Sequence, residues 1–171
     1  MDNKIKAMLT ELTDHINDDD LNVYEEKIVS ELENYEDKEA YIEEIFGIME
    51  KFPLTDWGMP GALAGFLESF DNDIYEKNLL DSLSRQPALQ TVWMLNRQIN
   101  SIKAENKGPY LQIMKNIAND TSLDKEITES AKEFADYQER AAASASQPRN
   151  GNHFNSLEQI FNMFNFIPKD K

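Results

Sequence analysis

The stretch from Asp37 to Pro53 reads DKEAYIEEIFGIMEKFP, and its pattern decides the fold class. Its apolar side chains recur at the spacing of one buried helix face. Asp37 is a candidate N-cap, and Pro53 would end the helix because proline has no backbone N–H to donate. The stretch therefore predicts an amphipathic helix that buries Tyr41, Ile42, Ile45, Phe46, Met49 and Phe52.

The same periodicity extends in both directions from this stretch. Towards the N-terminus it predicts two helices, and towards the C-terminus, after a glycine- and proline-rich turn, five more. No segment alternates in the way a half-buried strand does. We therefore expect an all-α fold of antiparallel helical hairpins, stacked in a HEAT-like or irregular bundle arrangement. The expected helices cover residues 5–16, 20–34, 62–70, 71–85, 87–99, 110–118 and 121–143.

The domain organisation follows from the composition near the C-terminus. Residues 1–143 are predicted to form one helical domain, and residues 144–153 are small and polar, which is typical of a flexible linker. Residues 154–167 place apolar side chains at helical spacing. We expect a C-terminal amphipathic helix here that docks on the same domain, because large exposed apolar patches are uncommon.

The charge of the chain limits its partners. The 171 residues include 32 acidic and 17 basic side chains, which gives a net charge of −15. Residues 1–50 alone contain 16 acidic and four basic side chains. Such a surface repels nucleic acid and anionic membranes, so we expect neither as a partner. A basic protein is the natural complement, because opposite fields speed association.

The N-terminal sequence MDNKIKAMLTELTDH lacks the apolar core of a signal peptide. No run approaches the roughly 20 apolar residues that a membrane-spanning helix needs. We therefore expect a cytoplasmic protein.

The residues that carry most catalytic chemistry are scarce. The chain has no cysteine, its two histidines are His15 and His153, and no nucleophile elbow or phosphate-binding glycine loop occurs. Glu33-x-x-Glu36 and Glu36-x-x-Glu39 match half of the paired-acid pattern with which all-α nucleotide pyrophosphatases hold magnesium. These acids straddle the predicted break between two helices. We predict no catalytic, metal or cofactor site, and a magnesium-dependent nucleotide hydrolase remains the enzymatic alternative.

Three motifs in the middle of the chain carry a resemblance to a known family. They are Asp56-Trp-Gly-Met-Pro-Gly61, Leu79-x-x-Ser82-x-x-Arg85-x-Pro87 and Thr91-Val-Trp-Met-Leu-Asn-Arg97-x-x-Asn100. Residues 56–100 resemble the helical immunity proteins of bacterial polymorphic-toxin and contact-dependent growth inhibition systems. The resemblance implies a small cytosolic protein that binds and neutralises a cognate toxin, without catalysis. Many such toxins are nucleases with basic clefts.

The motif residues themselves are expected to have structural roles. Trp57 and Trp93 should fill the core, and Gly58 and Gly61 should permit the turn. We expect the polar members of the motifs to bond the free backbone groups at helix ends. These members are Arg85, Asn96, Arg97 and Asn100.

The acidic N-terminal region supplies the candidate partner-binding residues. Aromatic side chains usually anchor such interfaces, and charges set the rate and selectivity of binding. We therefore predict a basic toxin domain as the partner and leave the oligomeric state open. A HEAT-like adaptor for another complex is the remaining alternative. The candidate acids are Asp18, Asp19, Asp20, Glu25, Glu26, Glu36, Asp37, Glu43 and Glu44, and the candidate anchors are Tyr24, Tyr35 and Tyr41.

Overall fold

A computed structural model describes residues 2–58 and 60–145, and this part of the chain is helical without strands. The predicted all-α class is confirmed. In chain order the elements are α1 (Asn3–Asp14), α2 (Leu21–Leu32), the 3-10 helix η1 (Lys38–Tyr41), α3 (Ile42–Lys51), α4 (Ala62–Glu68), α5 (Asn72–Arg85), α6 (Leu89–Ser101), the 3-10 helix η2 (Ala104–Asn106), α7 (Gly108–Ala118) and α8 (Lys125–Ala145).

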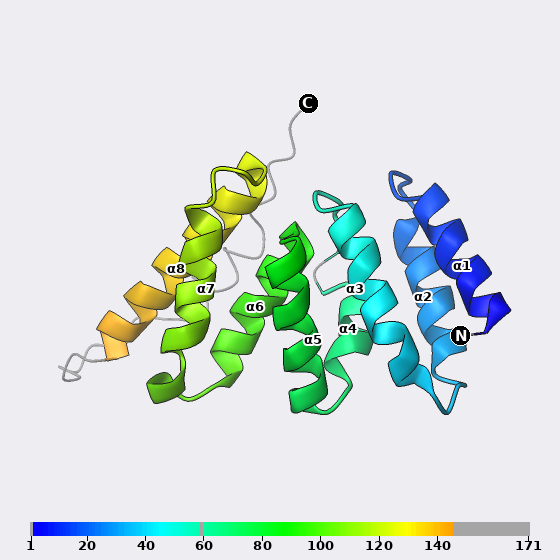
Figure 1. Cartoon of the computed structure of the whole chain (residues 1–171), viewed down its shortest axis with the longest axis horizontal. Helices are drawn as coiled ribbons and strands as arrows, with labels where there is room; N and C mark the ends of the chain where they lie inside the picture. Colours follow the sequence, from blue (N-terminus) through cyan, green and yellow to red (C-terminus); the bar gives the residue numbers. More distant parts are fainter. Residues whose placement is uncertain (1, 59, 146–171) are drawn as a thin grey trace, which may run out of the picture.

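The helices run alternately up and down and stack side by side along the long axis of the molecule (Figure 1). Successive helices pack as pairs, α1 on α2, α5 on α6 and α7 on α8. The pairs are joined by packing of α2 on α4, α3 on α5 and α6 on α8. The molecule is therefore a row of antiparallel helices with loops along two opposite edges. We call these the upper and lower edges, as they appear in Figure 1.

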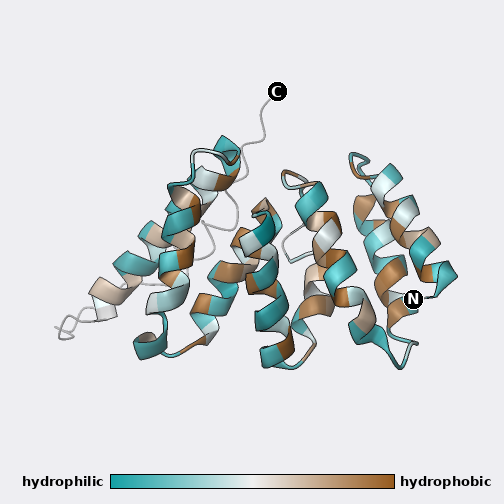
Figure 2. Ribbon diagram, in the orientation of Figure 1, coloured by the Kyte–Doolittle hydropathy of each residue, from teal (hydrophilic) through white to brown (hydrophobic). Residues whose placement is uncertain are grey.

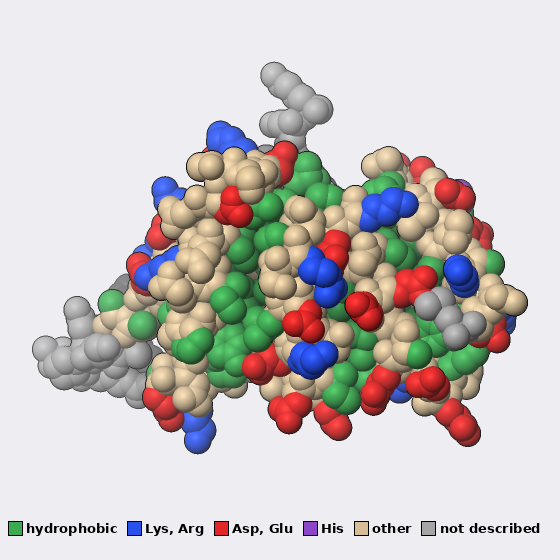
Figure 3. Space-filling model, viewed as in Figure 1, with side chains coloured by type: hydrophobic (Ala, Val, Ile, Leu, Met, Phe, Trp, Pro, Cys, Tyr) green, Lys and Arg blue, Asp and Glu red, His purple; other side chains and the backbone are tan. Residues whose placement is uncertain are grey.

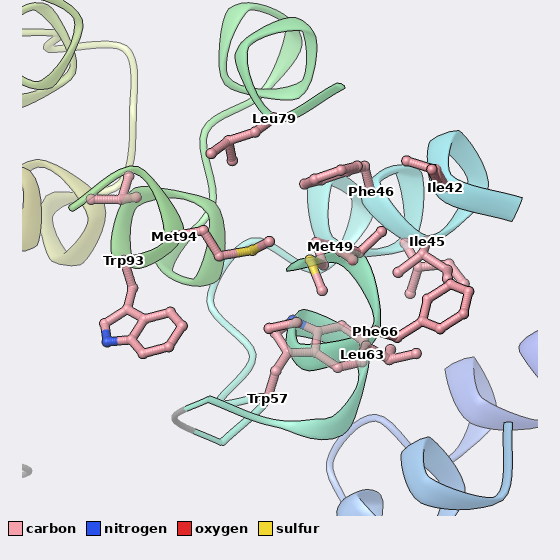
Figure 4. Packing of buried hydrophobic residues seen from close by; sticks show 14 of the residues in the cluster. Ile42, Ile45, Phe46, Met49, Trp57, Leu63, Phe66, Leu79, Trp93 and Met94 are labelled. Carbon is pink, nitrogen blue, oxygen red and sulfur yellow. The ribbon is translucent and has the colours of Figure 1, made fainter. Parts of the chain in front are cut away.

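A single apolar core runs through the stack. The apolar side of each helix is turned towards its neighbours (Figure 2). Trp57 and Trp93 are both buried, as predicted, with exposed fractions of 2% and 3%. Figure 4 shows Trp57 beside Met49 and Leu63, where the loop before α4 closes over the core. The loop that contains the first motif is therefore held by its tryptophan.

Several helix ends differ from the expected ones. The helix expected from Asp37 begins as η1 and continues as α3. Asp20 and Asp37 occupy N-cap positions, but neither side chain makes a capping hydrogen bond. Pro87 precedes α6 instead of lying in its first turn, and the Ala88 N–H donates to Thr91 Oγ1 at 3.0 Å.

The last helix is longer than expected. Ser144 and Ala145, which were predicted to lie in the linker, belong to α8. Alanine has the highest helix propensity, and the Ser144 hydroxyl donates to the Arg140 carbonyl oxygen one turn earlier at 2.9 Å. The rest of the predicted linker, residues 146–153, and the predicted amphipathic helix, residues 154–167, lie outside the described residues.

Candidate functional site

The upper-edge loop between α1 and α2 presents Asp18, Asp19 and Asp20, and all three are exposed. The Asp18 carboxylate lies 2.6 Å from His15 Nδ1, and this hydrogen bond raises the pKa of His15. Tyr24 is half-buried and stacks on the His15 ring, with ring centroids 4.2 Å apart. The loop therefore combines three surface carboxylates with an aromatic pair.

Glu25 is not a surface acid. It is 1% exposed, and its Oε2 accepts a hydrogen bond from the Leu63 N–H at 3.1 Å, at the start of α4. Successive helical residues point about 100° apart, so Glu26 beside it is exposed. The expectation that Glu25 contacts a partner is therefore corrected: its carboxylate is buried between α2 and α4.

Tyr41 is also buried, at 3% exposure. Its Oη accepts a hydrogen bond from the Asp2 N–H at 3.0 Å, and its ring meets Tyr35 edge to face. Tyr35 is half-buried. Of the two tyrosines, Tyr35 is the one that remains available as an anchor, because Tyr41 belongs to the core.

A pocket of about 410 Å³ opens on the lower edge, between the loop after α2 and the turn between α4 and α5. Inside it, Lys38 Nζ lies 5.8 Å from the centre of the Phe70 ring, within range of a cation–π interaction. Figure 3 shows acidic side chains gathered along this edge. We call this the loop pocket; it is lined by Glu36, Asp37, Lys38, Glu39, Ser69, Phe70 and Asp71.

The remaining candidate acids lie on the first turn of α3. Glu43 is exposed, whereas Glu44 is half-buried and its Oε2 has no hydrogen-bond partner within residues 2–58 and 60–145. This turn follows η1 directly, so Glu43 and Glu44 lie towards the lower edge, like Glu36 and Asp37.

The candidate acids therefore form two groups instead of one face. Asp18, Asp19 and Asp20 precede α2, while Glu36 and Asp37 follow it. A helix of 12 residues is roughly 18 Å long at 1.5 Å per residue, so the two groups lie at opposite ends of α2.

Five residues of the loop pocket are absent from the partner-binding candidates that the sequence predicts: Lys38, Glu39, Ser69, Phe70 and Asp71. Residues 36–39 and 69–71 meet because α2 packs on α4, and each loop follows one of these helices. Sequence patterns reveal helix faces, but they do not reveal which loops become neighbours. The pocket appears only once the helices are stacked.

The polar motif residues bond other side chains, not the helix ends that we expected. Arg85 pairs with Glu50, and Arg97 pairs with Glu68, each with an N–O distance of 2.7 Å. Asn96 and Asn100 accept hydrogen bonds from Gln138 Nε2, at 2.8 and 2.7 Å. These contacts join α3 to α5, α4 to α6, and α6 to α8. The motif residues therefore hold neighbouring helices together.

Two further properties of the described residues bear on function. In residues 2–58 and 60–145, no three or more histidine, aspartate or glutamate side chains gather in a way that could hold a metal ion. Glu33, Glu36 and Glu39 run from the end of α2 through the loop into η1, so they do not share a helix face. The helices in these ranges are all too short or too polar to cross a membrane.

Comparison with known proteins gives no match: no family model, no curated protein and no solved structure is similar to the chain. Its function is therefore inferred from its residues and their geometry.

Proposed function

We propose that this chain is a cytoplasmic immunity protein, which binds and neutralises a basic toxin domain and performs no catalysis. The observation that carries the proposal is the loop pocket, whose lining includes four acidic residues and the Phe70 ring. Residues 36–39 of the pocket belong to the strongly acidic region 1–50, which has 16 acidic and four basic side chains. The resemblance of residues 56–100 to immunity proteins supports the same function.

The chemistry of the loop pocket suits a lysine or arginine side chain. Glu36, Asp37, Glu39 and Asp71 outnumber the one ammonium group, that of Lys38. The Phe70 ring already lies under a cation at 5.8 Å, and arginine and lysine both bind such rings. A cationic side chain of the toxin would therefore meet charge and an aromatic surface together. Clefts that bind nucleic acid carry many such side chains.

The first test is capture of the partner by the tagged full-length chain from the cells that produce it. We expect one stoichiometric, basic protein that stops growth when it is expressed alone and is tolerated when this chain is co-expressed. A captured partner that is harmless alone would contradict the immunity function and favour an adaptor. Magnesium-dependent hydrolysis of a nucleotide by the pure chain would contradict the absence of catalysis.

The second test separates the two acidic groups. The triple variant Glu36→Gln, Asp37→Asn, Glu39→Gln removes three carboxylates from the loop pocket. The matched control Asp19→Asn, Asp20→Asn, Glu26→Gln removes three exposed carboxylates outside the pocket, two just before α2 and one halfway along it. We expect the pocket variant to weaken toxin binding at least about tenfold, equivalent to about 1.4 kcal/mol.

The control should change the toxin Kd by less than about threefold and act mainly on the association rate, as distant surface charges do. Isothermal titration calorimetry and surface plasmon resonance give both quantities. Equal losses in the two variants would show that the overall field binds the toxin. A larger loss in the control would move the site to the loop of Asp18, Asp19 and Asp20.

A further inference from the structure

Glu25 is a buried carboxylate at the joint between α2 and α4. Its Oε2 accepts a hydrogen bond from the Leu63 N–H at 3.1 Å, and the side chain is 1% exposed. The backbone of Gly61 passes so close that a Cβ there would lie 3.2 Å from Oε2 and 2.2 Å from the Trp57 carbonyl oxygen. The carboxyl group is therefore enclosed by α2 on one side and by Trp57, Gly61 and Leu63 on the other.

Among residues 2–58 and 60–145, no lysine, arginine or histidine forms an ion pair with Glu25. The ion pairs that involve α2 and α1 use other residues: Lys4 with Glu31, Lys27 with Glu11, and His15 with Asp18. On α4, Glu68 pairs with Arg97.

The charged groups that act on Glu25 are acids, Asp56 from the loop and Glu26 from α2. Burial, aided by these two acids, raises the pKa of Glu25 to about 7, although the N–H groups of Leu63 and Ala62 favour the ionised form. Burial therefore favours the neutral, protonated form of Glu25 over the ionised form.

We propose that Glu25 is a proton-operated latch, which holds residues 56–58 and the start of α4 against α2 while it is protonated and loosens them when it ionises. The proposal is independent of the function proposed above. The direction of the pH dependence follows from the number of protons that the attached and detached states bind. A detached loop exposes Glu25 to water, where its pKa returns to about 4.3. Between that value and about 7, detachment releases a proton, so it becomes easier as the pH rises and levels off above 7.

Loosening the latch would release a specific part of the core. Trp57 lies in the loop, is 2% exposed, and its Nε1 has no hydrogen-bond partner among the described residues. Its departure is opposed by the loss of its apolar packing and, in the same loop, by the hydrogen bond that Gln90 Nε2 donates to the Pro60 carbonyl oxygen at 3.1 Å. The exchange rate of the Leu63 amide hydrogen reports directly on this contact, because the Leu63 N–H donates its hydrogen bond to Glu25.

The test measures hydrogen-exchange protection of the amides of residues 61–64 in the full-length chain, from about pH 5 to about pH 8, corrected for intrinsic exchange. We expect protection to fall at least about tenfold across this range. Glu25→Gln keeps an acceptor oxygen without the charge, and should make the protection independent of pH. Glu33→Gln removes an exposed charge at the end of α2 that is not among the groups acting on Glu25, and it should behave like the parent chain.

A direct titration accompanies this test and does not need a variant. The side-chain carboxyl carbon of Glu25, followed by NMR in the parent chain, should titrate near neutral pH. An ordinary value of about 4.3 would overturn the proposal, even if Glu25→Gln fails to fold. Protection that does not vary with pH, or whose pH dependence Glu33→Gln abolishes as fully as Glu25→Gln does, would also overturn it.

Discussion

At Gly61 the backbone adopts a φ of +68°, and the space beside its Cα is already occupied. A Cβ at this position would lie 2.2 Å from the Trp57 carbonyl oxygen, which is a backbone atom and has no freedom to move aside. The tight turn brings Trp57 into the core and places the start of α4 against Glu25. The tight turn, the burial of Trp57 and the contact between Glu25 and the start of α4 therefore all depend on Gly61.

We expect Gly61→Ala to lower the free energy of unfolding by at least about 1–3 kcal/mol, because it adds both backbone strain and a clash. The matched control is Gly65→Ala within α4, where an added Cβ meets nothing within 4 Å. That change should stabilise by about 0.5–1 kcal/mol, since alanine is the better helix former. Urea denaturation measures both, and similar values for the two variants would contradict the proposed packing.

The sequence indicated the glycine turn and both buried tryptophans, because each follows from the residue type. It did not indicate that Glu25 is buried. The helical pattern of α2 does not separate Glu25 from Glu26, since both are glutamates. The partner that encloses Glu25 lies 38 positions away, at Leu63. A contact of that sequence separation is decided by how α4 stacks, which no local pattern records.

Among the elements, α6 and α8 are joined by one polar side chain. Gln138 on α8 donates to the Oδ1 atoms of Asn96 and Asn100, which lie one turn apart on α6. Gln138 and Asn96 are buried, at 3% and 9% exposure. The pair of asparagines therefore sets how α8 lies along α6.

We expect Gln138→Met, which is nearly isosteric, to destabilise the protein by about 1–3 kcal/mol, because it leaves the Asn96 oxygen buried without a donor. Gln112→Met on α7 is the control: Gln112 is exposed and bonds only to Asn116. It should change stability by less than about 0.5 kcal/mol. Thermal unfolding followed by circular dichroism compares the two. An undiminished melting temperature for Gln138→Met would show that the bond contributes nothing net.

The helices themselves were largely predictable, since their apolar spacing is regular and glycine, proline and aspartate mark their ends. Their polar contacts were not. Arg85 and Arg97 were expected at helix ends, and they instead reach Glu50 and Glu68 on neighbouring helices. Spacing shows which side of a helix is buried, but it does not show which helix lies against it.

At the scale of the whole molecule, negative charge works against the folded state. The net charge is −15, and residues 1–50 hold 16 of the 32 acidic side chains with only four basic ones. Folding brings these carboxylates closer together, and their repulsion weakens as salt shortens the range of the field. The acidic character that suits a basic partner therefore costs stability in the free chain.

We expect the melting temperature to rise by about 2–4 °C, or about 1 kcal/mol, between about 0.05 and about 0.5 M NaCl. In the variant Asp19→Asn, Asp20→Asn, Glu26→Gln, the melting temperature should be higher at low salt and respond less to added salt. Differential scanning calorimetry gives both values. A melting temperature that falls as NaCl is added would show that ion pairs, and not repulsion, dominate the surface.

Composition alone shows that the excess of acidic residues lies in the first third of the chain, so the acidic part of the candidate site could be predicted. The separation of Asp18, Asp19 and Asp20 from Glu36 and Asp37 followed only from the length of α2. The loop pocket needed a further contribution from residues 69–71, which lie beyond the acidic region. A surface made by two neighbouring loops depends on how the helices stack, so no single segment of the sequence predicts it.

The row of helices also has a mechanical consequence. Each helix packs on its neighbours along the long axis, so a bend of the molecule can be distributed over several helix interfaces. The two loops that line the pocket follow successive helices of this row, α2 and α4. A bend at the interface between α2 and α4 would therefore change the distance between these two loops. A molecule bound between the loops would in turn resist such a bend.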